Sequence, residues 1–281
     1  MPWLRSLALG SLLALVLSAA TAADEPYVDA MAREHAGDRP VAAAAGGEAA
    51  QNVQGELLVT EGLRAYLARP ADPPRAGLIV LHEWWGLNDN IREMSNRLAA
   101  EGYLALAVDL YGGEVAEDGA EARALMSSAM SDPDRVDAAL LAAHDWLAAH
   151  GGVTRTGSIG WCFGGALSLR AALLLPEDLD ATVIYYGRLV TDPEQLAPLG
   201  MPILGIFGGQ DRGIPLQSVH EFETVLNSLG KTADIVVYES ADHAFANPSG
   251  TRYDAEAAAD AWRRTLEFLA EHLQEGPAPG T

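Results

Sequence analysis

Four side chains in this chain have the chemistry needed to cleave an acyl compound: one thiol, one imidazole and two carboxylates. Cys162 is the only cysteine, and Glu83 precedes it while Asp211 and His243 follow it. A thiol attacks an acyl carbon when an imidazole takes its proton, and a carboxylate fixes the imidazole tautomer and stabilises the imidazolium. We therefore predict Cys162 as nucleophile, His243 as base and Asp211 as the acid that orients His243.

The residues around Cys162 are typical of a nucleophile elbow, a sharp turn between a strand and a helix. Cys162 lies in Gly160-Trp161-Cys162-Phe163-Gly164-Gly165, between an expected strand at 156–161 and an expected helix at 166–175. The turn strains the backbone of the nucleophile, so larger side chains two residues before or after it would collide. The alternative is that Cys162 is a small buried hydrophobe beside a close-packed pair of glycines.

Two other acids and several histidines compete for these roles. Asp109 also ends an expected strand, and Asp242 is adjacent to His243, but only Asp211 lies in a glycine-rich loop between Cys162 and His243. That order, nucleophile then acid then histidine, favours Asp211. We expect His35 to be solvated and without a partner. The remaining histidines are expected mostly on the surface or on helices, too scattered for a metal cluster: His82, His144, His150, His220 and His272.

Apolar runs alternating with helical patterns predict the fold. The continuous apolar run at 77–81 is typical of a strand buried on both faces. Strands alternating with helices predict an α/β fold with a mostly parallel central sheet and helices on both faces, whose active groups lie at the carboxyl ends of the strands. We expect antiparallel strands at 56–60 and 63–68, further strands at 77–81, 103–108, 156–161, 181–186, 203–208 and 233–238, and helices at 88–101, 117–130, 134–150, 166–175, 216–229 and 253–273.

The first residues have the pattern of a secretory signal peptide. Arg5 precedes an apolar run at 7–17 and a stretch of small residues at 18–23, in which Ala20-Thr21-Ala22 suits cleavage. An uncleaved anchor helix is the alternative, but the apolar run is short for a bilayer span. We expect residues 1–23 to be removed from an exported protein, periplasmic or secreted, without stable membrane insertion. A flexible extension at 24–54 and a tail at 276–281 would flank one domain at 55–275.

Charge and cysteine content narrow the class of protein further. The formal net charge is −21, which argues against nucleic acid and anionic membrane surfaces as partners. One cysteine cannot form an internal disulfide, and a free thiol in an oxidising compartment is a chemical liability. The thiol is therefore a candidate for a retained function. We expect a monomer that acts on a small molecule.

From about Gly55 to Leu273 the chain resembles the dienelactone hydrolase family of α/β-hydrolases. The motifs that carry this resemblance occur in order at compatible spacing: Leu81-His82-Glu83-Trp84-Trp85-Gly86, Val108-Asp109-Leu110-Tyr111, Gly160 to Gly165, Tyr185-Tyr186-Gly187, Gly208-Gly209-Gln210-Asp211 and His243-Ala244-Phe245-Ala246. The resemblance implies a Cys162, Asp211, His243 triad that needs no cofactor. It also implies that Glu83 contacts the resting thiol and swings away when substrate binds, which would keep the thiol protonated until then; a solvated loop acid is the alternative.

The position of these motifs also suggests an oxyanion hole and a substrate pocket. Backbone N–H groups of Phe163 and Trp84 would form the oxyanion hole. The pocket would be lined by Trp85, Tyr111, Tyr186, Phe245 and Asn247, although the tryptophans could be ordinary core residues. Family members that act on dienelactone hold its carboxylate with two arginines. Here Asn247 replaces one of them and Arg123 is shifted in register from the other, which disfavours dienelactone itself.

These observations predict an exported hydrolase that cleaves a carboxylic ester or lactone through an acyl-thioester on Cys162. Two alternatives stay open. One is a general carboxylesterase of the same fold, and the other is a non-catalytic protein in which Cys162 is an oxidisable switch.

Overall fold

The computed structural model describes residues 21–38, 40, 53 and 55–273. The signal-like residues 1–20, most of the linker and the tail predicted at 276–281 lie outside this part of the chain. Within it, no helix is both long enough and apolar enough to cross a bilayer.

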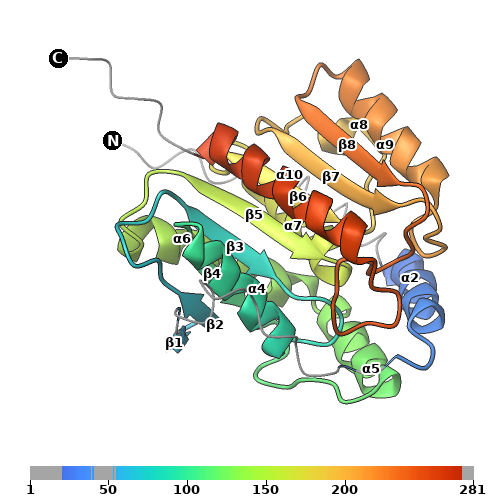
Figure 1. Ribbon diagram of the computed structural model, residues 1–281, viewed down its shortest axis with the longest axis horizontal. Coiled ribbons are helices and arrows are strands. Elements are labelled where there is room, and N and C mark those ends of the chain that lie inside the picture. Colours follow the sequence, from blue (N-terminus) through green and yellow to red (C-terminus); the bar gives the residue numbers. More distant parts are fainter. Residues whose placement is uncertain (1–20, 39, 41–52, 54, 274–281) are drawn as a thin grey trace.

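An eight-stranded sheet forms the centre of the molecule (Figure 1). Its strands lie in the order β1-β2-β4-β3-β5-β6-β7-β8, and all pair in parallel except β1 with β2 and β2 with β4. The predicted α/β-hydrolase fold class is therefore confirmed. The strands are β1 (Glu56–Thr60), β2 (Leu63–Ala68), β3 (Gly77–Leu81), β4 (Leu104–Val108), β5 (Thr156–Trp161), β6 (Ala181–Tyr185), β7 (Ile203–Gly208) and β8 (Ala233–Tyr238).

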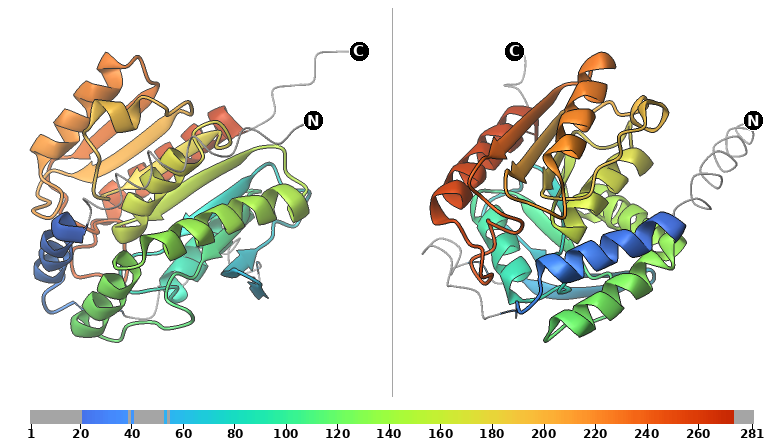
Figure 2. Two further views of the ribbon diagram at one scale, coloured as in Figure 1. Left: turned by 180° about the vertical axis from the view of Figure 1, so that it is seen from behind. Right: turned by 90° about the vertical axis from the view of Figure 1, so that its right-hand side faces the viewer.

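Helices cover both faces of the sheet. In Figure 1, α4 and α10 lie in front of the sheet, whereas the view from behind in Figure 2 has α6 and α7 on the opposite face. The described helices are α2 (Thr21–Glu34), α4 (Asp89–Ala100), α5 (Gly119–Met130), α6 (Pro133–His150), α7 (Phe163–Leu174), α8 (Pro193–Leu196), α9 (Leu216–Ser228) and α10 (Ala255–Leu273).

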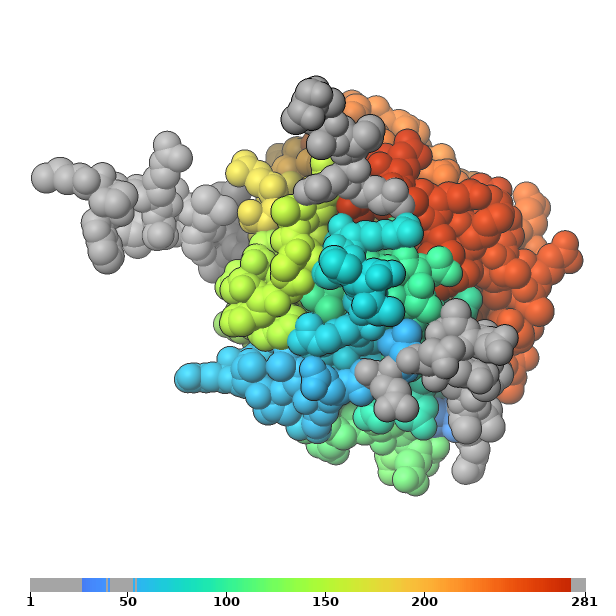
Figure 3. All heavy atoms as spheres, turned by 60° about the vertical axis from the view of Figure 1, so that its left-hand side comes forward, coloured from blue at the N-terminus to red at the C-terminus, as the bar shows by residue number. Residues whose placement is uncertain are grey.

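Double coverage explains the apolar runs in the sequence. Every residue of β3, β4, β5, β6 and β7 is buried, so these strands present hydrophobic side chains to both layers. In contrast, β1 is an exposed edge strand, and Figure 3 shows the hairpin that it forms with β2 at the margin of the molecule. The sheet therefore forms a rigid core whose carboxyl edge is free to carry functional groups.

Local capping sets where the helices begin. Asp118 accepts hydrogen bonds from the first turn of α5, and Asp132 caps α6, which begins with Pro133. The largest differences from prediction concern α7 and α8. Helix α7 begins at Phe163, three residues earlier than expected, because the glycines after Cys162 continue its first turn. The single turn α8, capped by Asp192, was not predicted.

The turn at Cys162 has the strain expected of a nucleophile elbow. Cys162 has φ 55° and ψ −117°. A Cβ atom on Gly160 would lie 2.0 Å from the carbonyl oxygen of Gly164, and one on Gly164 would lie 2.1 Å from that of Leu81. The predicted steric role of these two glycines is therefore confirmed.

The segment before the domain is more ordered than the sequence suggested. We predicted one or two helical turns over Tyr27 to His35 within a flexible extension, but α2 has 14 residues. It lies alongside α5 at the carboxyl edge of the sheet, as the right-hand view of Figure 2 shows. Tyr27, Val28 and Met31 are buried against the domain. Residues 21–38 are called the arm below.

Replacing Gly160 by alanine is expected to destabilise the protein by more than about 3 kcal/mol, because backbone atoms would have to move to admit the new Cβ. Gly119→Ala is the matched control: its Cβ would lie 3.6 Å from the nearest atom, in Trp84. That change should alter the free energy of unfolding by less than about 1 kcal/mol. Denaturant unfolding of both variants measures the difference, and equal stabilities would contradict the close-packing argument.

Candidate active site

The sheet brings Cys162, Asp211 and His243 together at the carboxyl ends of three parallel strands. Cys162 follows β5, Asp211 follows β7 and His243 follows β8. Nδ1 of His243 lies 2.7 Å from Oδ2 of Asp211, and both side chains are fully buried. Oδ1 of Asp211 accepts hydrogen bonds from the N–H groups of Gly213 and Ile214 at 2.8 Å. The loop therefore fixes the carboxylate, and the carboxylate fixes the imidazole.

The two rival acids bond elsewhere. Asp109 forms an ion pair with Arg64 at 2.8 Å and accepts the backbone N–H of Tyr111 at 3.0 Å. Asp242 accepts the backbone N–H of His243, not its ring, at 2.7 Å. Asp211 is thus the acid that contacts the His243 imidazole among the three considered.

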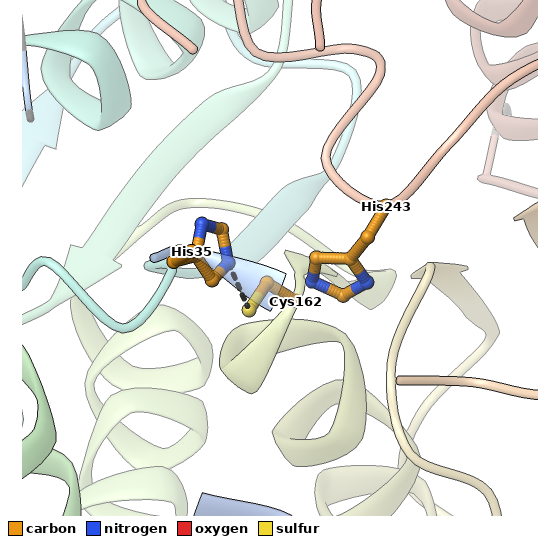
Figure 4. Close-up of side chains that lie close together, drawn as sticks. All are labelled: His35, Cys162 and His243. Carbon is orange, nitrogen blue, oxygen red and sulfur yellow. Dashed lines mark hydrogen bonds between the residues drawn. The ribbon is translucent and has the colours of Figure 1, made fainter. Parts of the chain in front are cut away.

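The expectation that His35 is solvated was wrong. His35 is 2% exposed, and its Nε2 atom lies 3.9 Å from Sγ of Cys162 (Figure 4). Its ring stacks on Trp84 with centroids 4.6 Å apart and meets the ring of His243 edge-on at 5.2 Å. The histidines are therefore less scattered than we expected, because two imidazoles lie beside the only thiol.

A network of hydrogen bonds holds the end of the arm in place. Asp38 accepts from Nδ1 of His35 at 3.0 Å, from Nη2 of Arg252 at 2.9 Å and from the hydroxyl of Thr251 at 2.6 Å. Arg252 also donates to the carbonyl oxygens of Glu34 and His243. The sequence offered one signal for this arrangement, the three-residue spacing of His35 and Asp38, but nothing in it identified the distant partner Arg252.

The arm also covers the thiol of Cys162. Sδ of Met31 lies 3.8 Å from Sγ of Cys162, and both residues are 0% exposed. An acyl carbon must approach the sulfur to about 3–3.5 Å before attack. Because Met31 and His35 already occupy neighbouring positions at van der Waals distance, a substrate can reach Cys162 only if part of the arm moves.

The charges around the thiol favour a thiolate paired with imidazolium. Burial alone raises the pKa of Cys162, but the neighbouring His243 and then His35 lower it by more, so its net shift is downward. Burial lowers the pKa of His243, whereas the charges of Asp211 and Cys162 raise it well above its usual value. Burial likewise lowers the pKa of His35, but the hydrogen bond to Asp38 and the neighbouring Cys162 together raise it by more, so its net shift is upward.

Glu83 is a buried carboxyl group, not a solvated loop acid. It is 1% exposed, and Oε2 accepts a hydrogen bond from the side chain of Asn247. Burial, followed by the charge of Cys162, raises the pKa of Glu83 to about 7. The role of Glu83 in gating the thiol stays a prediction; here the side-chain contacts of the sulfur are with Met31 and His35.

Aromatic side chains enclose the group. Tyr186, which has an unusual φ of 35°, meets the ring of His243 edge-on at 5.2 Å, and Phe245 lies next to it. The hydroxyl of Tyr111 donates to the carbonyl oxygen of Trp84 at 3.2 Å. Trp85 lies edge-on to His35. The predicted pocket residues therefore surround the site, but Asn247 contacts Glu83 and Ser249.

The two residues predicted to donate to the oxyanion lie at a helix start and in a turn. Phe163 is the first residue of α7, and Trp84 follows β3. His82, just before them, is a buried structural residue: its Nδ1 lies 2.6 Å from the carbonyl oxygen of Glu83, and its Nε2 accepts the N–H of Leu110 at 3.3 Å. His82 thereby ties the loop after β3 to the loop after β4.

The fold and this site define an α/β-hydrolase, and comparison with known proteins gives its family. The family model "Dienelactone hydrolase family" matches residues 63–273. The chain is similar to putative carboxymethylenebutenolidases of Escherichia coli (37% identity, 75% of this chain and 83% of the relative) and Saccharolobus solfataricus (33%, 74% and 93%). A crystal structure of a putative dienelactone hydrolase from Klebsiella pneumoniae is 33% identical, with TM-score 0.68 over 78% of this chain and 98% of that one.

This chain belongs to the dienelactone hydrolase family. It is an enzyme that hydrolyses an ester or lactone. The matched region begins after the arm, so the family match does not include Met31, His35 or Asp38.

Glu83→Gln is expected to stabilise the protein at pH 8 by up to about 3 kcal/mol and to change stability little at pH 5. The pKa of Glu83 is raised from 4.5 to about 7 on folding, so the folded state binds the extra proton and stability falls as pH rises through this range. Denaturant unfolding at both pH values measures the effect. Glu61→Gln, in an exposed turn, is the control, and a Glu83→Gln gain independent of pH would contradict the assignment.

Asp38→Ala is expected to increase the rate at which iodoacetamide alkylates Cys162 by about tenfold or more, because hydrogen bonds to charged groups contribute about 1.5–3 kcal/mol each. The rate should be measured near pH 9, where the thiol is ionised in both proteins.

Asp29→Ala is the matched control for that experiment. It removes an exposed ion pair between the same helix and Arg123 on α5, so it should hardly change the rate. Equal alkylation rates in wild type and Asp38→Ala would show that the network around Asp38 does not hold the arm over the thiol.

Proposed function

We propose that this protein is an exported hydrolase that cleaves a carboxylic ester or lactone through an acyl-thioester on Cys162. The observation that carries the proposal is the 2.7 Å contact between His243 and Asp211, next to a thiol held at φ 55°. This geometry supports base catalysis by His243 on a nucleophile presented by a strained turn. The family match supports the same class of reaction.

The reaction would proceed in two steps. The Cys162 thiolate attacks the acyl carbon, and the N–H groups of Phe163 and Trp84 stabilise the oxyanion while the imidazolium of His243 protonates the leaving alkoxide. His243 then removes a proton from water, which attacks the thioester and releases the carboxylic acid. The thiolate and imidazolium are restored, and no cofactor is consumed. Asp211 stabilises the imidazolium in the resting state and orients the neutral imidazole in the acyl-thioester.

The substrate is proposed to be an uncharged ester or lactone. The name carboxymethylenebutenolidase carried by the relatives supports a lactone. However, Asn247 is engaged by Glu83, Arg123 pairs with Asp29 on the surface, and the formal net charge of −21 does not attract anions. Arg252, the cation beside His35, already binds Asp38. These contacts disfavour a substrate whose own carboxylate must be bound by a cationic side chain, as that of dienelactone must.

Export is proposed from the signal-like pattern at residues 1–23. A periplasmic or secreted location would expose a free thiol to oxidants, and burial beneath the arm would protect it there. Glu83 remains the candidate for gating the thiol, because its carboxyl group lies in the same buried cluster and its pKa responds to the charge of Cys162.

Cys162→Ala and His243→Ala are each expected to reduce kcat/KM for p-nitrophenyl acetate at least about 10³-fold, and Asp211→Asn by about 10²-fold or more. Each change removes a group that the proposed mechanism requires: the nucleophile, the proton carrier or the acid that orients it. Steady-state hydrolysis with circular dichroism as a check on folding measures this. His220→Ala, an exposed residue of α9, is the control. Wild-type turnover by a folded Cys162→Ala protein would rule out the thioester.

A further inference from the structure

The arm adds two electron-pair donors to the thiol and imidazole of the active site. The ligand atoms of His35, Cys162 and His243 all lie within 4.8 Å of one another. Figure 4 shows the two imidazoles on either side of the thiol. Sδ of Met31 lies 3.8 Å from Sγ, and all four residues are at most 2% exposed. The cluster is therefore a compact group of nitrogen and sulfur donors shielded from water.

Both imidazoles are oriented as metal-binding histidines are. Nδ1 of His243 contacts Asp211 at 2.7 Å, and Nδ1 of His35 contacts Asp38 at 3.0 Å and Nη2 of Arg252 at 3.0 Å. The Asp211 carboxylate on Nδ1 of His243 fixes the tautomer whose Nε2 lone pair is free, the usual arrangement around a metal ligand, whereas Nδ1 of His35 faces both the Asp38 acceptor and the Arg252 donor. Nε2 of His243 is buried and has no hydrogen-bond partner among the described residues. This nitrogen becomes a ligand when the metal displaces its proton.

The spacing of these donors suits one small ion. Around a tetrahedral d¹⁰ ion, a thiolate and an imidazole nitrogen are about 3.6 Å apart and two sulfur ligands about 3.8 Å apart. The observed separations are 3.9 Å between Cys162 and His35 and 3.8 Å between Cys162 and Met31. Bringing all three donors of the 4.8 Å cluster into contact with one ion requires shifts of at most about 1.5 Å.

We propose that Cys162, His35 and His243, with Met31 as fourth ligand, bind a single copper(I) ion. Thiolate and thioether are soft ligands that select copper(I), and imidazole suits copper as well. Zinc is usually bound by thiolate, imidazole and carboxylate, so a thioether among the four ligands favours copper(I) over zinc. Two of the four ligands come from the arm, so binding would fix the arm over the nucleophile.

The consequence for turnover rests on the proposed function. Copper(I) would occupy the electron pair that the Cys162 thiolate uses for attack and would hold Met31 and His35 where the acyl group must enter. The loaded protein would therefore be inactive, and its thiol would be protected from oxidation. Removing the ion would restore both the nucleophile and the mobility of the arm.

The test is an anaerobic titration of the full mature protein with copper(I), in competition with the chromophoric chelator bicinchoninate. We expect one ion per chain. Cys162→Ala should abolish competition, and His35→Ala and Met31→Leu should each weaken binding at least about tenfold. Zinc, titrated separately, should bind more weakly and be insensitive to Met31→Leu. His220→Ala, exposed on α9, is the matched control and should bind as wild type does.

Two results would overturn the proposal. One is failure of the wild-type protein to compete for copper(I). The other is wild-type affinity in both folded His35→Ala and Met31→Leu, which would mean that the thiol alone captures the metal. Hydrolysis of p-nitrophenyl acetate by metal-free wild type is measured in parallel. Turnover without copper binding would contradict only the proposed copper site. Copper binding without turnover would contradict only the proposed hydrolase activity.

Discussion

The active site depends on neutralising a thiolate in a place that water does not reach. Cys162 is 0% exposed, and an unpaired charge there would be very costly. Two imidazoles and the carboxylates behind them distribute that charge: Asp211 supports His243, and Asp38 supports His35. Each carboxylate is itself satisfied, the first by the N–H groups of a tight loop and the second by Arg252 and Thr251. These hydrogen bonds and ion pairs hold the loops around the site in fixed positions.

The sheet supplies the rigidity that such an arrangement requires. Strands β5, β7 and β8 end at one edge, so three loops far apart in sequence deliver Cys162, Asp211 and His243 to one point. The elbow at Cys162 stores backbone strain, which persists because Gly160 and Gly164 allow β3, β5 and α7 to approach closely. The positions of the reacting groups are thereby set by the core and not by the loops themselves.

Most of the domain could be predicted from the sequence because its elements obey local rules. The continuous apolar run at 77–81 marked β3 at its observed bounds, and the bounds expected for β5 and β7 also agree with the structure, so that Cys162, Asp211 and His243 follow strands as expected. The arm could not be predicted in this way. Its contacts with the domain join residues more than a hundred positions apart, such as His35 with Cys162 and Asp38 with Arg252. Helix α2 lies in an alanine-rich segment whose sequence pattern does not indicate which distant residues it will contact.

The arm changes the protonation state of the thiol that the family resemblance led us to expect. A carboxylate next to the thiol would keep it protonated, whereas His35 and His243 favour the thiolate. A thiol with a lowered pKa is more reactive toward oxidants as well as toward acyl groups, so a physical barrier around the sulfur protects it. Met31 and the stacked rings of His35 and Trp84 form that barrier. Activation and protection are thus linked through one segment, because the residue that helps to ionise the nucleophile is held by the same helix that covers it.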